Sequence, residues 1–286
     1  MRAEQLLFTY LHLAVEEELT YALMERRVCA VAYETVESKR GALPLLTPMS
    51  EVAGRMSVQV AANYLQRTNG GRGKLLGGVA GVRRSTLTII GGGVVGINAA
   101  QIALGMGAQT VILDIDADRL RYLDQVLHGN FNTLSSNPRN IADAVHVSDV
   151  VIGAVLVRGA RAPRLVTCEM ISAMKPGAVM VDVAVDQGGC IETIKPTSHS
   201  DPIYEIDGVI HYGVTNMPGA VPRTSTYALS NATLPYGLKL ANQGLKAAVE
   251  SDAGLGLGVN VLNGRITYPA VAEAFGLEYT ALSEVL

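Results

Sequence analysis

A glycine-rich turn at residues 91–96, Gly-Gly-Gly-Val-Val-Gly, lies between an apolar run over 86–90 and a helix-like stretch. The next apolar run ends in Asp114, at about the 20-residue spacing typical of a ribose-binding acid. This order of strand, turn, helix, strand and acid is the pattern that binds a dinucleotide. Since a dinucleotide coenzyme carries hydride, the pattern indicates redox chemistry.

Each residue type in this pattern has a physical task. We expect Gly91 to turn the chain out of its strand, Gly93 to admit the pyrophosphate and Gly96 to let the helix pack on the sheet. The helix N-terminus would face the phosphates with free N–H groups. The Asp114 carboxylate would bind the ribose hydroxyls and repel a 2′-phosphate, which favours NAD over NADP. Asp116 lies beyond the expected strand end and is the weaker candidate; a purely structural glycine loop is the alternative interpretation.

Composition indicates a globular protein with a large core. The 286 residues are 49% hydrophobic and suit two domains or one large one. The net charge of −3 provides no electrostatic reason to expect a nucleic acid partner. The cysteines at 29, 168 and 190 lack metal or redox spacing and favour a reducing cytoplasm. Residues 85–113 carry no charge, but the glycines within them favour a strand, a helix and a strand over a membrane span.

The middle of the chain alternates apolar runs with amphipathic stretches. We expect strands at 86–90, 109–113, 132–135, 149–155, 178–183 and 208–213. Helices are expected at 94–106, 117–127, 138–147 and 167–174, with Asp116 and Thr167 as N-caps. Near-continuous apolar strands fit a sheet that is covered on both faces. The predicted fold class is therefore α/β, with a doubly wound parallel sheet of Rossmann type.

The two ends of the chain read as pieces of a second α/β domain, split by insertion of the sheet domain. Strands are expected at 5–13 and 28–33 around a helix at 16–26, and a long helical pattern opens the segment 223–286. Prolines at 44 and 48, and at 218 and 222, mark the two crossings. The predicted boundaries are 1–44 and 223–286 for the split domain and 45–222 for the NAD-binding domain.

Two further residues could carry acid–base chemistry. Ligands of open α/β sheets lie beyond the carboxyl ends of the strands, where Asp186 follows the strand over 178–183 beside two glycines. Asp182 falls inside that strand, where we expect a structural partner. His12 lies near the end of the first strand and can exchange protons near neutral pH, as hydride transfer at a C–N or C–O centre requires. From position alone, a surface turn for Asp186 and a structural hydrogen bond for His12 stay open.

Several blocks of the sequence resemble the alanine dehydrogenase family. They are residues 8–14 (Phe-Thr-Tyr-Leu-His-Leu-Ala), 32–35, 45–55, 182–189 and 216–222. The resemblance runs from residue 5 to the C-terminus. The related transhydrogenase subunit shares the fold but is not expected to carry a histidine in the Tyr-Leu-His-Leu block, so His12 favours the dehydrogenase.

The resemblance implies NAD-dependent oxidative deamination of L-alanine to pyruvate and ammonia, and the reverse amination. In that scheme His12 is the general acid/base, and Asp186 orients the reacting amine or water. The family also implies a homo-oligomer, commonly a hexamer. Lys195 stands where the family can place an arginine near the cofactor. The positions expected to bind NAD are Ser50, Gly91, Gly93, Val94, Val95, Gly96, Asp114, Arg119, Ser136, Val155, Leu156, Val183, Asn216 and Met217.

Two departures from the family pattern qualify this prediction. The family's N-terminal segment, which supplies an arginine and a lysine that grip the substrate, has no counterpart here. We therefore expect a truncated substrate domain. Either the sequence is a fragment or comes from a mis-started gene, or the protein binds NAD with reduced or altered catalysis. Some members hold a metal between a glutamate, which matches Glu34, and a histidine, but Gln243 stands at the second position, so no metal is expected. The alternatives are a non-catalytic NAD-binding or assembly module and a transhydrogenase-like component.

Overall fold

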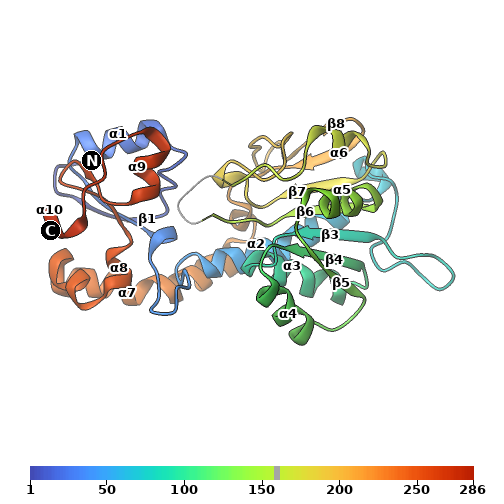
Figure 1. Ribbon diagram of the computed structural model, residues 1–286, viewed down its shortest axis with the longest axis horizontal. Helices are drawn as coiled ribbons and strands as arrows, with labels where there is room; N and C mark the ends of the chain where they lie inside the picture. The colour runs from blue at the N-terminus through green and yellow to red at the C-terminus, as the bar shows by residue number, and fades with distance from the viewer. Residues whose placement is uncertain (158–161) are drawn as a thin grey trace. The chain divides into compact units, whose positions relative to one another are not determined.

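The computed structural model describes residues 1–157 and 162–286. The chain forms two compact units. The central unit comprises residues 50–156 and 162–221, and the split unit comprises residues 1–49, 157 and 222–286. Each unit has its own sheet and its own hydrophobic core (Figure 1).

The central unit contains a seven-stranded sheet in the order β5-β4-β3-β6-β7-β9-β8. All six predicted strands are confirmed, and they pair in parallel with one another. Their bounds are β3 (Thr86–Ile90), β4 (Gln109–Asp114), β5 (Phe131–Ser135), β6 (Val150–Gly153), β7 (Val179–Asp182) and β9 (Val209–Tyr212). The order reverses between β3 and β6, which makes the sheet doubly wound.

The predicted parallel sheet is confirmed, and the structure adds one antiparallel strand at its edge. Strand β8 (Ile203–Ile206) pairs antiparallel with β9. A two-residue turn joins the two strands, with Asp207 at φ 51° and Gly208 at φ 76°. Asp-Gly is a strong sequence signal for such a hairpin, because both central residues need a positive φ. The dipeptide could therefore have revealed the seventh strand.

The helices of the central unit begin where local chemistry predicts. They are α2 (Thr47–Tyr64), whose first residues belong to the split unit, α3 (Val94–Gly105), α4 (Ala117–Val126), α5 (Pro138–Val147) and α6 (Cys168–Ser172). The side chains of Asp116 and Thr167 cap α4 and α6 as expected, and Asn137 caps α5. Short 3₁₀ turns η2 (Arg67–Asn69), η3 (Val185–Gln187) and η4 (Met217–Ala220) complete the unit.

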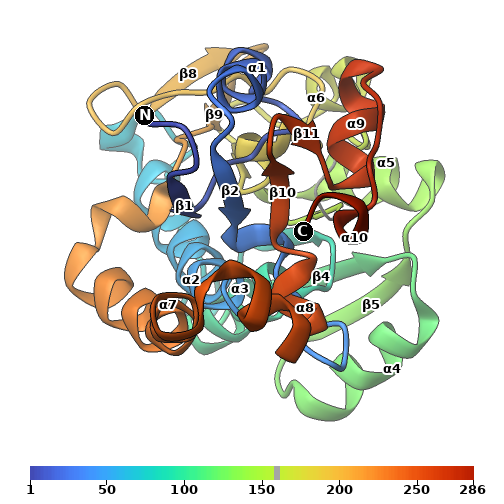
Figure 2. The ribbon, with the colours of Figure 1, turned by 90° about the vertical axis from the view of Figure 1, so that its left-hand side faces the viewer.

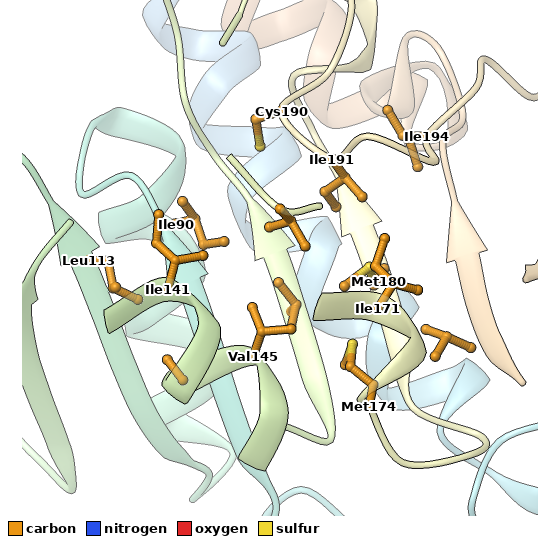
Figure 3. Packing of buried hydrophobic residues seen from close by; sticks show 14 of the residues in the cluster. Ile90, Leu113, Ile141, Val145, Ile171, Met174, Met180, Cys190, Ile191 and Ile194 are labelled. Carbon is orange, nitrogen blue, oxygen red and sulfur yellow. The ribbon is translucent and has the colours of Figure 1, made fainter. Parts of the chain in front are cut away.

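Helices cover both faces of the central sheet. Ile141 and Val145 of α5 and Ile171 of α6 point toward the strands, where they pack with Ile90 and Met180 (Figure 3). Successive strand residues point to opposite faces, so Ile89 faces away from this cluster. A Cβ on Gly96 of α3 would lie 3.4 Å from Cγ2 of Ile89, which puts α3 on the second face.

The split unit contains a four-stranded sheet built from both ends of the chain (Figure 2). The strands β1 (Leu6–Thr9), β2 (Cys29–Ala32), β10 (Val259–Leu262) and β11 (Arg265–Ile266) follow in that order across the sheet. The pair β1–β2 is parallel, whereas β10 pairs antiparallel with both β2 and β11. The helical elements are α1 (Glu17–Glu25), η1 (Tyr33–Thr35), α7 (Pro222–Ser251), α8 (Ala253–Gly256), α9 (Pro269–Phe275) and α10 (Leu282–Val285).

Two predicted elements of the split unit differ from the structure. The strand expected at 5–13 ends at Thr9, because His12 adopts a left-handed φ of 50° that no strand accommodates. The long C-terminal helix is broken at Gly244, whose φ of 73° and ψ of 169° are not helical. Across the described residues, no helix combines the length and apolar character needed to cross a membrane.

Glycine lets α2 and α3 approach closely, which generates a test of the packing. A Cβ on Gly54 would lie 2.3 Å from the carbonyl oxygen of Val95, so Gly54→Ala must push the helices apart. We expect a loss of about 1–3 kcal/mol and a melting temperature lower by about 3–10 °C. The control Gly105→Ala has open space around the added methyl group and should stabilise the protein slightly. Calorimetry distinguishes the two variants, and equal melting temperatures would contradict the packing argument.

Candidate functional site

The point where the strand order reverses forms the centre of the candidate site. Strands β3 and β6 are neighbours, although β4 and β5 separate them in the sequence. Beyond their carboxyl ends the chain leaves in different directions, which opens a crevice in folds of this kind. Gly91 follows β3 with φ 104°, and a Cβ there would lie 2.6 Å from the carbonyl oxygen of Ala154, which follows β6. Only glycine fits this position.

The structure brings most of the predicted coenzyme-contacting residues of the central unit to one edge of the sheet. Each follows the carboxyl end of a parallel strand, and these strands are adjacent. They are residues 91–96 after β3, Asp114 at the end of β4, Ser136 after β5, Val155 and Leu156 after β6, Val183 after β7, and Asn216 and Met217 after β9. The predicted catalytic residue Asp186 also follows β7.

The first turn of α3 is available to an anion. Gly93 is its N-cap and has no side chain to satisfy the first N–H groups, in contrast to the capped helices α4, α5 and α6. Within the described part of the chain, nothing lies within 4 Å of where a Cβ on Gly93 would stand. Val94 is 38% exposed at the start of this turn. Free N–H groups and the helix dipole favour a phosphate here.

Asp114 shapes the glycine turn. One of its carboxylate oxygens accepts a hydrogen bond from the N–H of Gly92 (2.7 Å), and the other accepts from the N–H of Asp116 (2.9 Å). A carboxylate has about four lone-pair sites, so both oxygens keep capacity for ribose hydroxyls. The sequence analysis assigned no task to Gly92, yet a Cβ there would lie 2.7 Å from Leu123 and 3.2 Å from the Asp114 carboxylate.

Arg119 supports the same turn from α4. Its Nε donates to the carbonyl oxygen of Gly92 (2.5 Å), and an Nη donates to that of Gly93 (3.3 Å). The guanidinium also lies 4.9 Å from the ring centroid of Tyr122, a cation–π distance. These contacts hold the carbonyl oxygens of Gly92 and Gly93 toward α4, and they put a positive charge beside the glycine turn.

Ser50 approaches this region through α2. It lies one helical turn before Gly54, the residue at which α2 meets the backbone of α3. At the next residue, the Nε of Arg55 donates a hydrogen bond to Oδ1 of Asn98 (2.9 Å) and so links the two helices. The amide of Asn98 in turn donates to the carbonyl oxygen of Val94 (2.9 Å).

Asp182 holds the loop that carries Asp186. Its carboxylate is buried and accepts hydrogen bonds from the N–H groups of Ala184 (2.9 Å), Cys190 (2.8 Å) and Ile191 (3.1 Å). The expected structural role of Asp182 is thus confirmed. Asp186 lies in η3 within this loop, and its Oδ1 accepts from the N–H of Asn216 (3.3 Å). The loop after β7 and the loop after β9 therefore meet at Asp186.

The pKa of Asp182 reflects two opposing influences. Burial of the carboxyl group raises its pKa to about 6. The three N–H donors and the positive charge of Arg164 lower the pKa, but by less than burial raises it. Arg164 also donates from its guanidinium to the carbonyl oxygen of Ile191 (2.5 Å). At neutral pH the group is thus an anion that backbone dipoles hold in place.

His12 lies in the split unit, in the loop that follows β1. The backbone N–H of His12 donates to Oε1 of Glu34 (2.6 Å), and the backbone N–H of Leu11 donates to both oxygens of the same carboxylate (3.2 and 3.3 Å). The imidazole stacks on Tyr10, with ring centroids 6.0 Å apart and an interplanar angle of 10°. Its Nδ1 is buried without a hydrogen-bond partner among the described residues. The contact between Glu34 and the His12 loop was not predicted.

Several other predicted positions have ordinary structural partners. Lys195 lies over the ring of Tyr204, with Nζ 4.4 Å from the centroid. Cys190 is buried, and burial together with the Asp182 charge raises the pKa of its thiol, which makes it a poor nucleophile. Gln243 stands at the position where some family members have a metal-binding histidine. Its side-chain oxygen accepts a hydrogen bond from the hydroxyl of Ser251 (3.3 Å).

Two models of one protein family match successive parts of the chain. Residues 1–53 match the model described as "Alanine dehydrogenase/PNT, N-terminal domain", and residues 57–269 match the C-terminal domain model of the same family. The chain belongs to the alanine dehydrogenase/PNT family. This family depends on a pyridine nucleotide.

Individual relatives agree with this assignment. The chain is 58% identical over 282 residues to a protein named alanine dehydrogenase from Staphylococcus haemolyticus, and 56% identical over 283 residues to one of the same name from Methanococcus maripaludis. These matches cover 98% and 99% of this chain and 76% of each relative.

Solved structures extend the comparison to the fold. A structure titled L-alanine dehydrogenase superimposes with a TM-score of 0.87 at 56% identity, and it covers 96% of this chain and 76% of its own. A transhydrogenase from Sinorhizobium meliloti has a TM-score of 0.73 at 23% identity, over 93% of this chain and 76% of its own. The second likeness concerns the fold alone.

The raised pKa of Asp182 predicts a pH-dependent stability. The folded pKa of about 6 exceeds the ordinary 3.8, so the native state binds more protons between these values. The free energy of unfolding should therefore fall as pH rises from about 4 to 6, by about 3 kcal/mol from this group. Urea titrations from pH 4.5 to 7.5 should show most of this fall in the wild-type protein relative to Asp182→Asn. A difference between the two proteins that does not vary with pH would contradict the assignment.

Proposed function

We propose that this protein catalyses the NAD-dependent oxidative deamination of L-alanine to pyruvate and ammonia, and the reverse amination. The observation that carries the proposal is the uncapped first turn of α3 beside Asp114, at the reversal of strand order, in a chain 56–58% identical to proteins named alanine dehydrogenase. The balanced reaction consumes L-alanine, water and NAD and produces pyruvate, ammonium, NADH and a proton.

The residues at the crevice fit a dinucleotide. Gly93 leaves room at the helix N-terminus for the pyrophosphate, and the Asp114 carboxylate suits the ribose hydroxyls. When bound, NAD supplies the hydride acceptor for the Cα–H of the substrate. The remaining proposed contacts are Ser50, Gly91, Val94, Val95, Gly96, Arg119, Ser136, Val155, Leu156, Val183, Asn216 and Met217.

His12 is proposed as the general acid/base. Because its Nδ1 is buried without a partner, Nε2 is the nitrogen available for proton exchange. In the deamination direction, Nε2 would take a proton from the water that attacks the imine carbon. It would then return the proton to the nitrogen of the carbinolamine, from which ammonia leaves.

Asp186 is proposed to orient the amine or the attacking water. Its carboxylate lies beyond the carboxyl end of β7, two strands from β3, on the edge proposed to bind the coenzyme. The N–H of Asn216 holds one of its oxygens, so the carboxylate has a defined direction. A fixed acceptor for N–H or O–H groups reduces the orientational entropy that the reaction must otherwise lose.

Two other functions receive less support. A non-catalytic NAD-binding module would bind NAD without turnover of any amino acid. Such a module would not need a positioned acid/base, whereas here Glu34 binds the backbone of the proposed acid/base His12. A transhydrogenase-like component would exchange hydride between coenzymes, but the transhydrogenase comparison extends to the fold alone. Calorimetric NAD binding together with NADH formation from L-alanine identifies the dehydrogenase. A hydride-exchange assay between NADH and a partner-bound NADP then separates the transhydrogenase-like component from the non-catalytic module.

The acid/base assignment predicts a large kinetic effect at His12. We expect His12→Ala to lower kcat for NADH formation from L-alanine by about 10²–10⁴-fold, because a positioned general base contributes on that scale. The Kd for NAD, measured by calorimetry, should stay unchanged. The exposed His128 provides a matched control, and His128→Ala should keep the wild-type rate. An active His12→Ala enzyme would remove the proposed role.

The charge of Asp114 predicts coenzyme choice. Asp114→Asn keeps an oxygen for the N–H of Gly92 but removes the charge that repels a 2′-phosphate, so the ratio of kcat/KM for NADP to that for NAD should rise about tenfold or more. Asp116→Asn is the matched control, since asparagine also caps a helix. Its ratio should equal that of the wild-type enzyme. A shift in the Asp116 variant alone would transfer the role to that residue.

A further inference from the structure

The loop that carries His12 depends on one buried carboxylate. Glu34 follows β2, and residues 10–12 follow β1, its parallel neighbour. His12 and Glu34 are 22 residues apart in the chain, and they meet because the two strands end side by side. The Glu34 side chain is 3% exposed, and its oxygens accept the N–H groups of Leu11 and His12.

The backbone at His12 is in a conformation that needs support. A non-glycine residue at φ 50° is in the left-handed region, which is sterically unfavourable for an L-amino acid. The 2.6 Å bond from its N–H to a carboxylate is of the short, charge-assisted kind that offsets such a cost. Glu34 thus favours a backbone geometry that His12 would otherwise rarely adopt.

The imidazole has little else to orient it. Its Nδ1 has no hydrogen-bond partner in the described part of the chain, so no side chain directs the ring through that nitrogen. The ring stacks on Tyr10, whose hydroxyl donates to the carbonyl oxygen of Leu45 (2.6 Å). Burial, together with the Glu34 charge, raises the pKa of this hydroxyl, which keeps it a donor. Among the described residues, Tyr10 and the Glu34-bound backbone therefore both support the ring.

We propose that Glu34 is a positioning residue, which holds the His12 backbone in its left-handed conformation and thereby directs the imidazole toward the substrate. This inference rests on the proposed function. Glu34 does not exchange a proton in the reaction, because its oxygens already accept the N–H groups of the loop. Its contribution passes entirely through His12.

A substitution that removes one acceptor tests this role. In Glu34→Gln the amide nitrogen cannot accept, so the loop loses part of its support while the side chain keeps its size. We expect kcat to fall about 10–100-fold through misplacement of His12. The Kd for NAD should be unchanged, since the proposed coenzyme contacts belong to the central unit. Thr267→Val removes a different buried hydrogen bond of the split unit, to the carbonyl oxygen of Val259, and should leave kcat unchanged.

A double-mutant cycle distinguishes positioning from a general structural role. If Glu34 acts only through His12, adding Glu34→Gln to His12→Ala should lower kcat no further. A loss of equal size in both backgrounds would overturn the proposal. So would a Glu34→Gln enzyme with wild-type kcat. Absence of turnover by the wild-type enzyme would instead reject the proposed function.

The hydrogen bond itself can be observed without turnover. The chain has five histidines, so selective ¹⁵N-histidine labelling produces few amide signals, and His12→Ala assigns the one of interest. We expect the His12 amide proton far downfield in the wild-type protein, as a short bond to a carboxylate requires, and upfield of that position in Glu34→Gln. An unremarkable wild-type shift would overturn the proposal, even if the variant fails to fold.

Discussion

The contact between Gly91 and Gly96 controls the geometry of the candidate coenzyme site. The carbonyl oxygen of Gly91 lies 1.9 Å from where a Cβ on Gly96 would stand, a separation that no other residue permits. Because of this contact, α3 begins directly at the end of β3 and not after a longer loop. Its uncapped first turn therefore lies at the crevice where the segments that follow β3 and β6 diverge. The approach of Arg119 and the hydrogen bond from Gly92 to Asp114 both depend on that tight turn.

A second device recurs in both units. Three carboxylates, those of Asp114, Asp182 and Glu34, each accept backbone N–H groups from a segment that follows a parallel strand. Such segments have left the sheet ladder, so their N–H groups need other acceptors. A carboxylate can serve several of them at once, and each bond is stronger than one to a neutral oxygen. Rigid loops follow from this arrangement, and each of the three loops carries a proposed functional residue.

The balance of burial and charge differs among these carboxylates. Asp114 lies at the crevice and keeps capacity for a ligand, whereas Asp182 and Glu34 are buried and committed to the backbone. For Asp182, desolvation outweighs its donors, and the pKa rises to about 6. The group is nevertheless ionised at neutral pH, where its N–H donors and Arg164 offset part of the cost of desolvation.

Much of this protein follows from the sequence by itself. Apolar periodicity predicts six strands and the helices between them, the glycine spacing predicts the turn, and short-range chemistry predicts the caps at Asp116 and Thr167. These features depend on residues within a few positions of one another, so local pattern is sufficient. The antiparallel strand β8 had a local signal as well, in Asp207 and Gly208, although strand periodicity did not reveal it.

Only the tertiary structure decided which distant groups meet. Glu34 and the N–H of His12 come together because β1 and β2 align in parallel and end at the same level. The carboxylate of Asp114 reaches Gly92 because β3 and β4 do the same. No short-range pattern encodes these contacts, since each depends on strand register and on the burial of both partners. The sequence alone therefore determined the glycine turn of the candidate coenzyme site, and the three-dimensional packing determined what holds the proposed catalytic residues in place.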